Sequence, residues 1–257
     1  MKPVIAFANH KGGVGKTTSV VNIASVLGEM GKRVLVIDID PQGSASLHFG
    51  VRDKGTGFLH AMERSVAAPV LPTAVGGVDL IPSGPALSEA AQRFSGVLGA
   101  ELLARCLART QGDWELVIID CPPGPGILTM SALRVSRHVV IPIETNRLAM
   151  SGLDQLIETL DSMRREDHRP GILGVVACRA NPRRRVHREI MADLERRFPG
   201  RIAPFVRENV ALAEAPAHEK PVTLYAPYSN GAADYRGVTE WLLKCLGEIN
   251  RYVNSDV

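Results

Sequence analysis

The sequence predicts an α/β protein with a doubly wound, mostly parallel, twisted sheet and helices on both of its faces. Short apolar runs without helical periodicity alternate along the chain with segments of helical periodicity. The short runs are apolar at every position, which is typical of parallel strands buried on both faces. No repeat, low-complexity tract or linker interrupts this alternation, so residues 1–257 are expected to form a single domain with ligands at the carboxyl ends of its strands.

The expected elements can be assigned in chain order. The strands are residues 3–8, 33–37, 116–119, 138–143 and 172–177. Apolar residues recur at helical spacing over residues 17–30, and Gly31 ends that helix. Residues 71–81 carry a Gly-Gly pair near their centre, which indicates a hairpin or an edge pair of strands.

The composition excludes several classes of protein. A hydrophobic content of 45% against 22% charged residues supports a sizeable core and argues against disorder. The four cysteines form no Cys-x-x-Cys pair, which argues against a zinc site or a disulfide framework and suits a reducing cytoplasm. There is no signal peptide, and no apolar run approaches the ~20 residues of a membrane span, so we expect a cytoplasmic protein.

Residues 10–18, H-K-G-G-V-G-K-T-T, lie between the first expected strand and the first helix. Apart from His10 at the first glycine position, they match the P-loop pattern G-x-x-x-x-G-K-[ST], whose backbone N–H groups surround phosphate at a helix N-terminus. Lys16 is expected to reach the β- and γ-phosphates, Thr17 to hold Mg²⁺, and Thr18 to contact the α-phosphate. The expected nucleotide-binding residues are Gly12, Gly13, Val14, Gly15, Lys16, Thr17 and Thr18. The alternative is a glycine-rich turn that binds nothing.

The second lysine of this loop, Lys11, makes the motif more specific. K-G-G-V-G-K-T-T resembles the deviant Walker A loop of the ParA/MinD family of ATPases. Further matches to the family are D-I-D-P-Q-G at residues 38–43, D-C-P-P at 120–123, residues 209–216 and S-N-G-A at 229–232. The resemblance covers essentially the whole chain and is greatest to short, Soj-like ParA proteins without an N-terminal helix-turn-helix.

This resemblance implies an ATP hydrolase with ATP and Mg²⁺ as cofactors. Lys11 would reach phosphates bound by the partner subunit, so that ATP is sandwiched in a homodimer. Lys16 and Asp40 complete the implied catalytic set, with Asp40 activating the attacking water. Asp38 would lie near the metal together with Thr17, and Asp120 would bind it through water. The alternative for a single aspartate at a strand end is a helix cap or a turn residue.

The adenine site is expected near R-A-N-P at residues 179–182, which follows a strand and resembles MinD-type members. Asn181 is the candidate for contacting the base. The alternative is that Asn181 forms an Asx-turn before Pro182.

The resemblance leaves two surfaces open, because ParA-type dimers bind nucleoid DNA without sequence preference and MinD-type dimers bind membrane. An arginine cluster favours DNA: Arg183, Arg184, Arg185, Arg188 and Arg207. The alternative is a solvated helix face with interleaved acidic residues. The last helix, residues 237–253, has an apolar face suited to the sheet and few basic residues, which argues against membrane binding.

We therefore expect a ParA-like ATPase whose slow hydrolysis is stimulated by a ParB-like or other partner protein and drives DNA segregation or cargo positioning at the nucleoid. The first alternative is a membrane-associated spatial regulator of the MinD type. An iron protein related to nitrogenase would need two cysteines per subunit for a shared cluster, and only Cys121 lies in a matching motif. A scaffold with an inactive P-loop is the last alternative, and the intact Lys16 and Asp40 argue against it.

Overall fold

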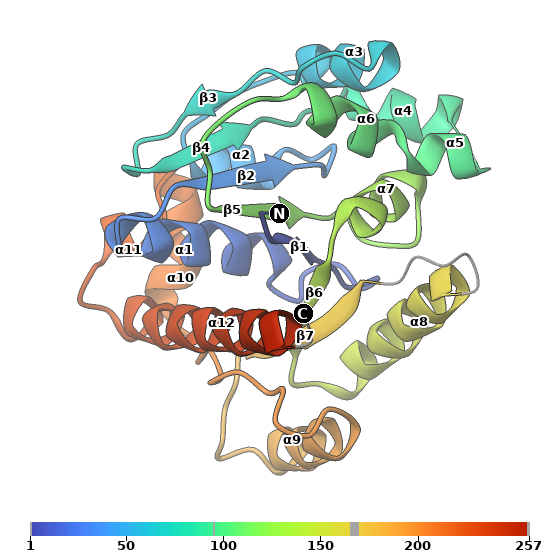
Figure 1. The fold of residues 1–257 in the computed structure, drawn as a ribbon. Coiled ribbons are helices and arrows are strands. Elements are labelled where there is room, and N and C mark those ends of the chain that lie inside the picture. Colours follow the sequence, from blue (N-terminus) through green and yellow to red (C-terminus); the bar gives the residue numbers. More distant parts are fainter. Residues whose placement is uncertain (1, 95, 165–169, 256–257) are drawn as a thin grey trace.

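A computed structural model of the chain describes residues 2–94, 96–164 and 170–255. Its centre is one seven-stranded sheet with the strand order β3-β4-β2-β5-β1-β6-β7. Adjacent strands are parallel except β3, which pairs antiparallel with β4 at the edge. The predicted fold class is confirmed, and the Gly-Gly segment forms the predicted edge pair (Figure 1).

The strands and helices have the following bounds. The strands are β1 Val4–Phe7, β2 Val34–Asp38, β3 Leu71–Pro72, β4 Val78–Ile81, β5 Leu116–Asp120, β6 His138–Glu144 and β7 Gly171–Cys178. The first helices are α1 Lys16–Glu29, α2 Ser44–His48, α3 Thr56–Arg64, α4 Leu87–Arg93, α5 Gly96–Ala100, α6 Leu102–Arg109 and α7 Ile127–Val135. The later ones are α8 Arg147–Arg164, α9 Arg185–Arg197, α10 Val210–Glu214, the 3₁₀ turn η1 Ala215–His218, α11 Val222–Tyr225 and α12 Asn230–Ser255.

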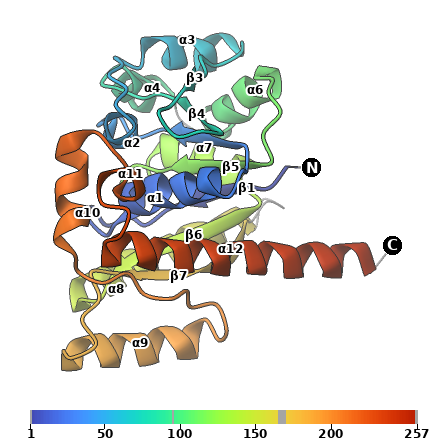
Figure 2. The ribbon, with the colours of Figure 1, turned by 90° about the vertical axis from the view of Figure 1, so that its left-hand side faces the viewer.

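Helices cover both faces of the sheet and enclose a separate apolar core on each side (Figures 1 and 2). Strand residues alternate between the two cores: Ile37 and Ile119 face one, whereas Val36 and Ile118 face the other. All four of these side chains are fully buried. Burial on both faces explains why the strands are apolar at every position.

The carboxyl ends of the three central strands bring the chemistry-bearing residues together. Asp38 ends β2 and Asp120 ends β5, and the two are direct neighbours in the parallel register. Phe7 at the end of β1 pairs with Asp120, and the P-loop begins three residues later, at His10. Because α1 starts at Lys16, this loop connects β1 to a helix N-terminus at the same edge.

The C-terminal helix α12 packs on the sheet as expected from its apolar face. Tyr235, Val238, Leu242 and Leu246 are buried in the core that also contains α1. The helix then extends past the sheet (Figure 2), and the side chains from residue 249 onward lie outside the described part. Among the described residues, no helix is both long and apolar enough to cross a membrane.

Candidate nucleotide-binding site

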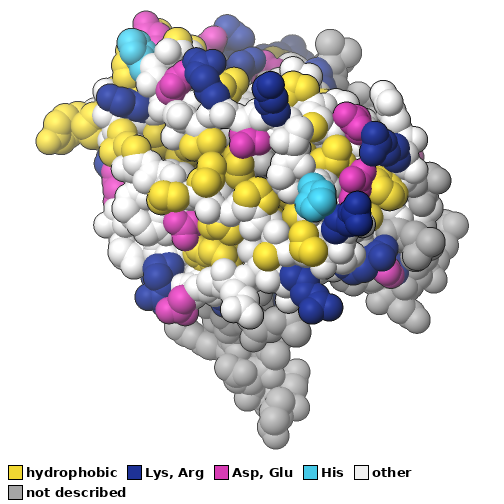
Figure 3. All heavy atoms as spheres, turned by 90° about the horizontal axis from the view of Figure 1, so that it is seen from above, with side chains coloured by type: hydrophobic (Ala, Val, Ile, Leu, Met, Phe, Trp, Pro, Cys, Tyr) yellow, Lys and Arg dark blue, Asp and Glu magenta, His cyan; other side chains and the backbone are white. Residues whose placement is uncertain are grey.

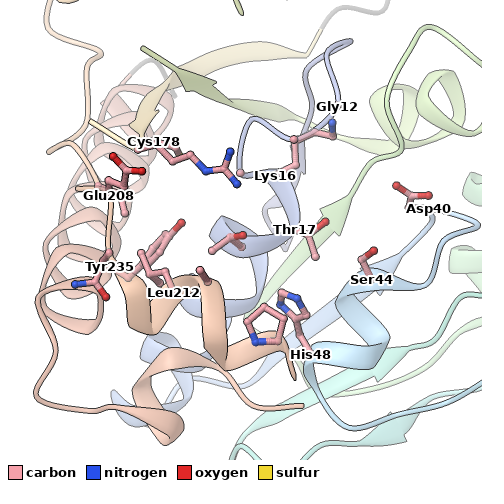
Figure 4. Close-up of a pocket in the computed structure, with 18 of the residues that line it drawn as sticks. Gly12, Lys16, Thr17, Asp40, Ser44, His48, Cys178, Glu208, Leu212 and Tyr235 are labelled. Atoms are coloured by element: carbon pink, nitrogen blue, oxygen red, sulfur yellow. The ribbon is translucent and has the colours of Figure 1, made fainter. Parts of the chain in front are cut away.

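A cavity of about 620 Å³ lies at the carboxyl edge of the sheet, beside the P-loop (Figure 4). It is lined by the P-loop and the start of α1, by the segment from Asp40 to α2, and by the segments that follow β7 and precede α12. The P-loop and α1 residues in the wall are Gly12, Gly13, Gly15, Lys16, Thr17 and Thr18. Such a volume is in the range of ordinary small-ligand sites.

The local conformation of the P-loop explains its glycines. Gly13 and Gly15 have φ values of 76° and 96°, in the left-handed region that glycine adopts without strain. A Cβ atom on Gly15 would lie 2.9 Å from Sγ of Cys178, at the end of β7. Gly15 precedes α1 directly, so the unpaired N–H groups of the first turn face the cavity. Position 15 therefore requires glycine for two separate reasons.

Lys16 is the buried cation of the site. Its Nζ donates to the carbonyl oxygen of Lys11 at 3.0 Å. Burial lowers the pKa of Lys16, and the carboxyl group of Asp120 opposes this shift. A partly desolvated ammonium group beside a helix N-terminus attracts anions strongly, which suits the phosphates of a nucleotide.

Thr17 and Asp120 form a pair suited to Mg²⁺. Thr17 Oγ1 donates to Asp120 Oδ2 at 2.7 Å, whereas Asp120 Oδ1 is buried without a hydrogen-bond partner. Burial, followed by the charge of Asp38, raises the pKa of Asp120 well above its usual value. A divalent cation held by a threonine hydroxyl, with a metal-bound water donating to the free carboxylate oxygen, would satisfy this buried group. The residues present therefore fit the metal.

Asp38 has a different environment from the one expected for a metal ligand. Its Oδ1 accepts from the backbone N–H of Asp40, and its Oδ2 accepts from both N and Oγ of Ser46. Burial raises the pKa of Asp38 to about 7, although these hydrogen bonds oppose the shift. Asp38 thus fixes the segment that carries Asp40 to the start of α2, and direct metal contact by Asp38 stays a prediction.

Asp40 lies in the cavity wall, within the loop that Asp38 holds (Figure 4). Its Oδ1 accepts from Gln42 N at 2.9 Å, and its carbonyl accepts from Ser83 Oγ at 2.6 Å. No described residue donates a hydrogen bond to the second carboxylate oxygen, which is available to a ligand or water. This arrangement suits a group that orients an attacking water molecule.

The structure places Asn181 outside the cavity wall, and contact between Asn181 and the base stays a prediction. Asn181 Oδ1 accepts from Arg183 N at 3.1 Å, so Asn181 forms the Asx-turn that was its alternative role, and Asn181 does not line the cavity. Arg207, which the sequence grouped with the DNA-binding arginines, lies in the cavity wall and forms a bidentate ion pair with Asp234. Of the five arginines predicted to bind DNA, Arg207 is the one that lines the cavity.

Several wall residues carried no recognisable signal in the sequence. They are Ser44, His48, Glu208 and Tyr235, whereas the wall residues Arg179 and Leu212 lie in segments that the sequence did single out. His48 points into the cavity beside Ser44 (Figure 4), and burial lowers its pKa to about 4, so its ring is neutral near pH 7. Tyr235 is fully buried, and its hydroxyl contacts Ser19 Oγ at 3.2 Å behind the P-loop. Asn209, inside a motif that the sequence did show, caps α10 through its side chain.

The other four arginines lie on α9 or directly before it, beyond the end of β7 (Figure 1). All four are exposed. Arg185 pairs with Glu189, and Arg188 donates to the carbonyls of Pro182 and Arg183. The side chains of Arg183 and Arg184 have no acidic partner among the described residues. The opposite end of the molecule, over α3 and α6, shows basic and acidic side chains interspersed (Figure 3).

A P-loop with a threonine–aspartate pair at the carboxyl ends of parallel strands defines a P-loop ATPase. A family model described as an AAA domain matches residues 2–171. Sporulation initiation inhibitor protein Soj of Bacillus subtilis is 34% identical over 91% of this chain and 96% of its own. Chromosome-partitioning ATPase Soj of Thermus thermophilus is 35% identical over 92% of this chain and 93% of its own. The chain belongs to the ParA/MinD family of P-loop ATPases, close to the Soj proteins.

The cofactors follow from the same comparisons. The structure of cobyrinic acid a,c-diamide synthase from Mycobacterium smegmatis with bound ADP and magnesium is 29% identical, with a TM-score of 0.76 and 95% of each chain covered. The predicted cofactors ATP and Mg²⁺ are thus confirmed, and they agree with the buried lysine and the unpartnered Asp120 oxygen of this site.

Proposed function

We propose that this ATPase acts as a partitioning or positioning switch of the ParA type. ATP would join two copies of the chain, the dimer would bind DNA without sequence preference, and hydrolysis stimulated by a ParB-like or other partner would dissolve it. The observation that carries this proposal is the position of Lys11. Six residues of its loop and of the start of α1 line the cavity, but Lys11 does not, and its Nζ instead lies 3.4 Å from Asn146 Oδ1, just before α8.

Because Lys11 does not line the cavity of its own subunit, its side chain is available to contact phosphates in the cavity of another subunit. The charge of an added cation stabilises phosphoryl transfer most when it reaches the transferred phosphoryl group directly. Supplied by a second subunit, Lys11 would make catalysis depend on dimerisation. Asp40 and the Thr17–Asp120 pair would then orient water and metal within each half of the shared site.

Arg183, Arg184 and Arg185, at and just before the start of α9, support DNA as the surface that the dimer binds. Arg183 and Arg184 are exposed cations without acidic partners among the described residues, and the side chain of Arg185 is 87% exposed despite its ion pair with Glu189. Exposed ion pairs contribute only about 0–1 kcal/mol, so a phosphate can displace Glu189 easily. Each lysine or arginine that meets a phosphate also makes binding more sensitive to salt.

The test is DNA binding measured with ATP, with ADP and without nucleotide, using a duplex of arbitrary sequence. We expect binding only with ATP, and a steep loss of affinity as salt is raised. Replacing Arg183, Arg184 and Arg185 with glutamate should remove DNA binding while ATP affinity stays unchanged. Binding of anionic lipid vesicles but not of DNA would instead assign the chain to the membrane-bound alternative, and unchanged DNA affinity in the variant would place the DNA surface elsewhere.

A further inference from the structure

Two hydrogen bonds hold the backbone of Lys11, and a third links one of its partners, Asn9, to β6. The N–H of Lys11 donates to Asn9 Oδ1 at 3.0 Å, and Asn9 Nδ2 donates to the carbonyl of Pro142 in β6 at 2.9 Å. The carbonyl of Lys11 accepts from Lys16 Nζ at 3.0 Å. Because Asn9 is buried, this attachment leaves only the side chain of Lys11 free to move.

Helix α8 approaches this backbone unusually closely at Gly152. A Cβ atom there would lie 2.7 Å from Asn9 Oδ1, 2.9 Å from Lys11 Cβ and 3.1 Å from Lys11 N. Any larger residue would therefore push α8 away from the P-loop. The close approach brings the start of α8 within reach of the Lys11 ammonium group.

At the start of α8, Asn146 contacts the Lys11 side chain. Asn146 Oδ1 lies 3.4 Å from Lys11 Nζ and also accepts from Ala149 N at 2.9 Å, so it caps the helix with the same oxygen. A separation of 3.4 Å is long for a hydrogen bond, and a helix N-terminus carries partial positive charge that repels a cation. The contact therefore orients Lys11 but holds it weakly, and a phosphate group would compete with it successfully.

The two lysines of the loop are linked through the carbonyl of Lys11. Lys16 donates to that carbonyl in the structure, although the position of Lys16 in the P-loop directs it to phosphates when nucleotide binds. Binding of ATP in a subunit's own cavity would thus remove the hydrogen bond from Lys16 to the backbone carbonyl of Lys11. The contact with Asn146, which holds the Lys11 side chain, would remain.

We propose that Asn146 is a positioning residue that holds Lys11 on its own subunit until phosphates bound by a second copy draw it across. This inference rests on the proposed role of Lys11 in trans. The strength of the Asn146 contact would then set how readily ATP joins two copies, because each lysine must leave Asn146 before it can reach the partner's site.

Two substitutions separate this role from helix capping. Serine and aspartate are both good N-cap residues, so Asn146→Ser and Asn146→Asp should each preserve the start of α8. Serine is too short to reach Lys11, whereas aspartate would form an ion pair with it. In an Asp40→Ala background that slows hydrolysis, we expect the serine variant to dimerise at about threefold to tenfold lower protein concentration, and the aspartate variant at a correspondingly higher one.

Dimerisation is measured by sedimentation velocity at saturating ATP and Mg²⁺, with thermal unfolding of each monomer as the control for folding. Opposite shifts in the two variants, with equal melting temperatures, would support the proposal. If Lys11→Ala fails to dimerise, shifts of the two Asn146 variants in the same direction, or no shift in either, would overturn the proposal. A Lys11→Ala variant that dimerises and hydrolyses ATP like the unchanged chain would overturn both this inference and the proposed role of Lys11.

Discussion

Replacing Thr17 with alanine tests the phosphate and metal site through one hydrogen bond. Thr17 Oγ1 donates to Asp120 Oδ2 at 2.7 Å, and the other oxygen of this fully buried carboxylate has no partner. Losing the donor would leave both oxygens unsatisfied. Hydrogen bonds to charged groups contribute about 1.5–3 kcal/mol, and in a chain of this size each kcal/mol lowers Tm by roughly 2–4 °C.

We expect a cost in the lower part of the range of about 1.5–3 kcal/mol, because the Asp120 carboxyl group can bind a proton once Thr17 no longer donates to it. Burial already raises the pKa of Asp120, so the neutral form is accessible and part of the cost is avoided. We therefore expect Thr17→Ala to lower Tm by about 3–6 °C without ligand. Thr17→Ser keeps the hydroxyl and should change Tm little.

The assay is thermal unfolding with and without Mg-ATP. A ligand at 100 times its Kd stabilises the folded chain by about 2.7 kcal/mol, which should appear as a rise in Tm for the unchanged chain and for Thr17→Ser. Thr17→Ala should lose most of this rise. A Thr17→Ala variant that melts like the unchanged chain and gains the full Mg-ATP shift would refute the assignment of Thr17 and Asp120.

Three further substitutions test other parts of the site. Lys16→Ala should abolish nucleotide binding measured by calorimetry, because it removes the buried cation, and retained ATP affinity would refute the P-loop assignment. Asp40→Ala should trap an ATP-bound dimer in size-exclusion chromatography, and a monomer with ATP would count against the shared site. Gly15→Ala should lower the free energy of unfolding by about 1–3 kcal/mol, because alanine is strained at this left-handed backbone position and its Cβ would be packed too closely against Cys178. Adding Cys178→Ala should recover only the part due to overpacking, so full recovery would contradict the backbone argument.

The fold could be predicted from the sequence because the five strands that it identified are largely apolar and are separated from one another by segments long enough to contain a helix. The P-loop was also predictable, since its residues are contiguous and its spacing is fixed by the size of a phosphate group. Asp120 ends an apolar strand and Asp40 lies two residues beyond the end of β2, so both stood out beside apolar runs in the sequence.

The remaining features depend on which strands are neighbours, and the sequence does not reveal strand order. Cys178 touches Gly15 because β7 ends beside the P-loop, although the two are far apart in the chain. Arg207 belongs to the cavity because Asp234, on α12, pairs with it there. For Asp38, the family resemblance favoured a place near the metal, and nothing in the sequence indicated that Ser46 would donate to one of its oxygens.

Mixing two inactive variants tests the central claim, that Lys11 of one subunit completes the ATP site of another. Lys11→Ala keeps an intact P-loop, and Lys16→Ala keeps Lys11 but cannot hold ATP. If Lys11 acts in trans, an equimolar mixture should hydrolyse ATP well above the sum of the two variants measured alone. A mixture that forms dimers with ATP, seen by sedimentation velocity, but hydrolyses no more than that sum would contradict the account.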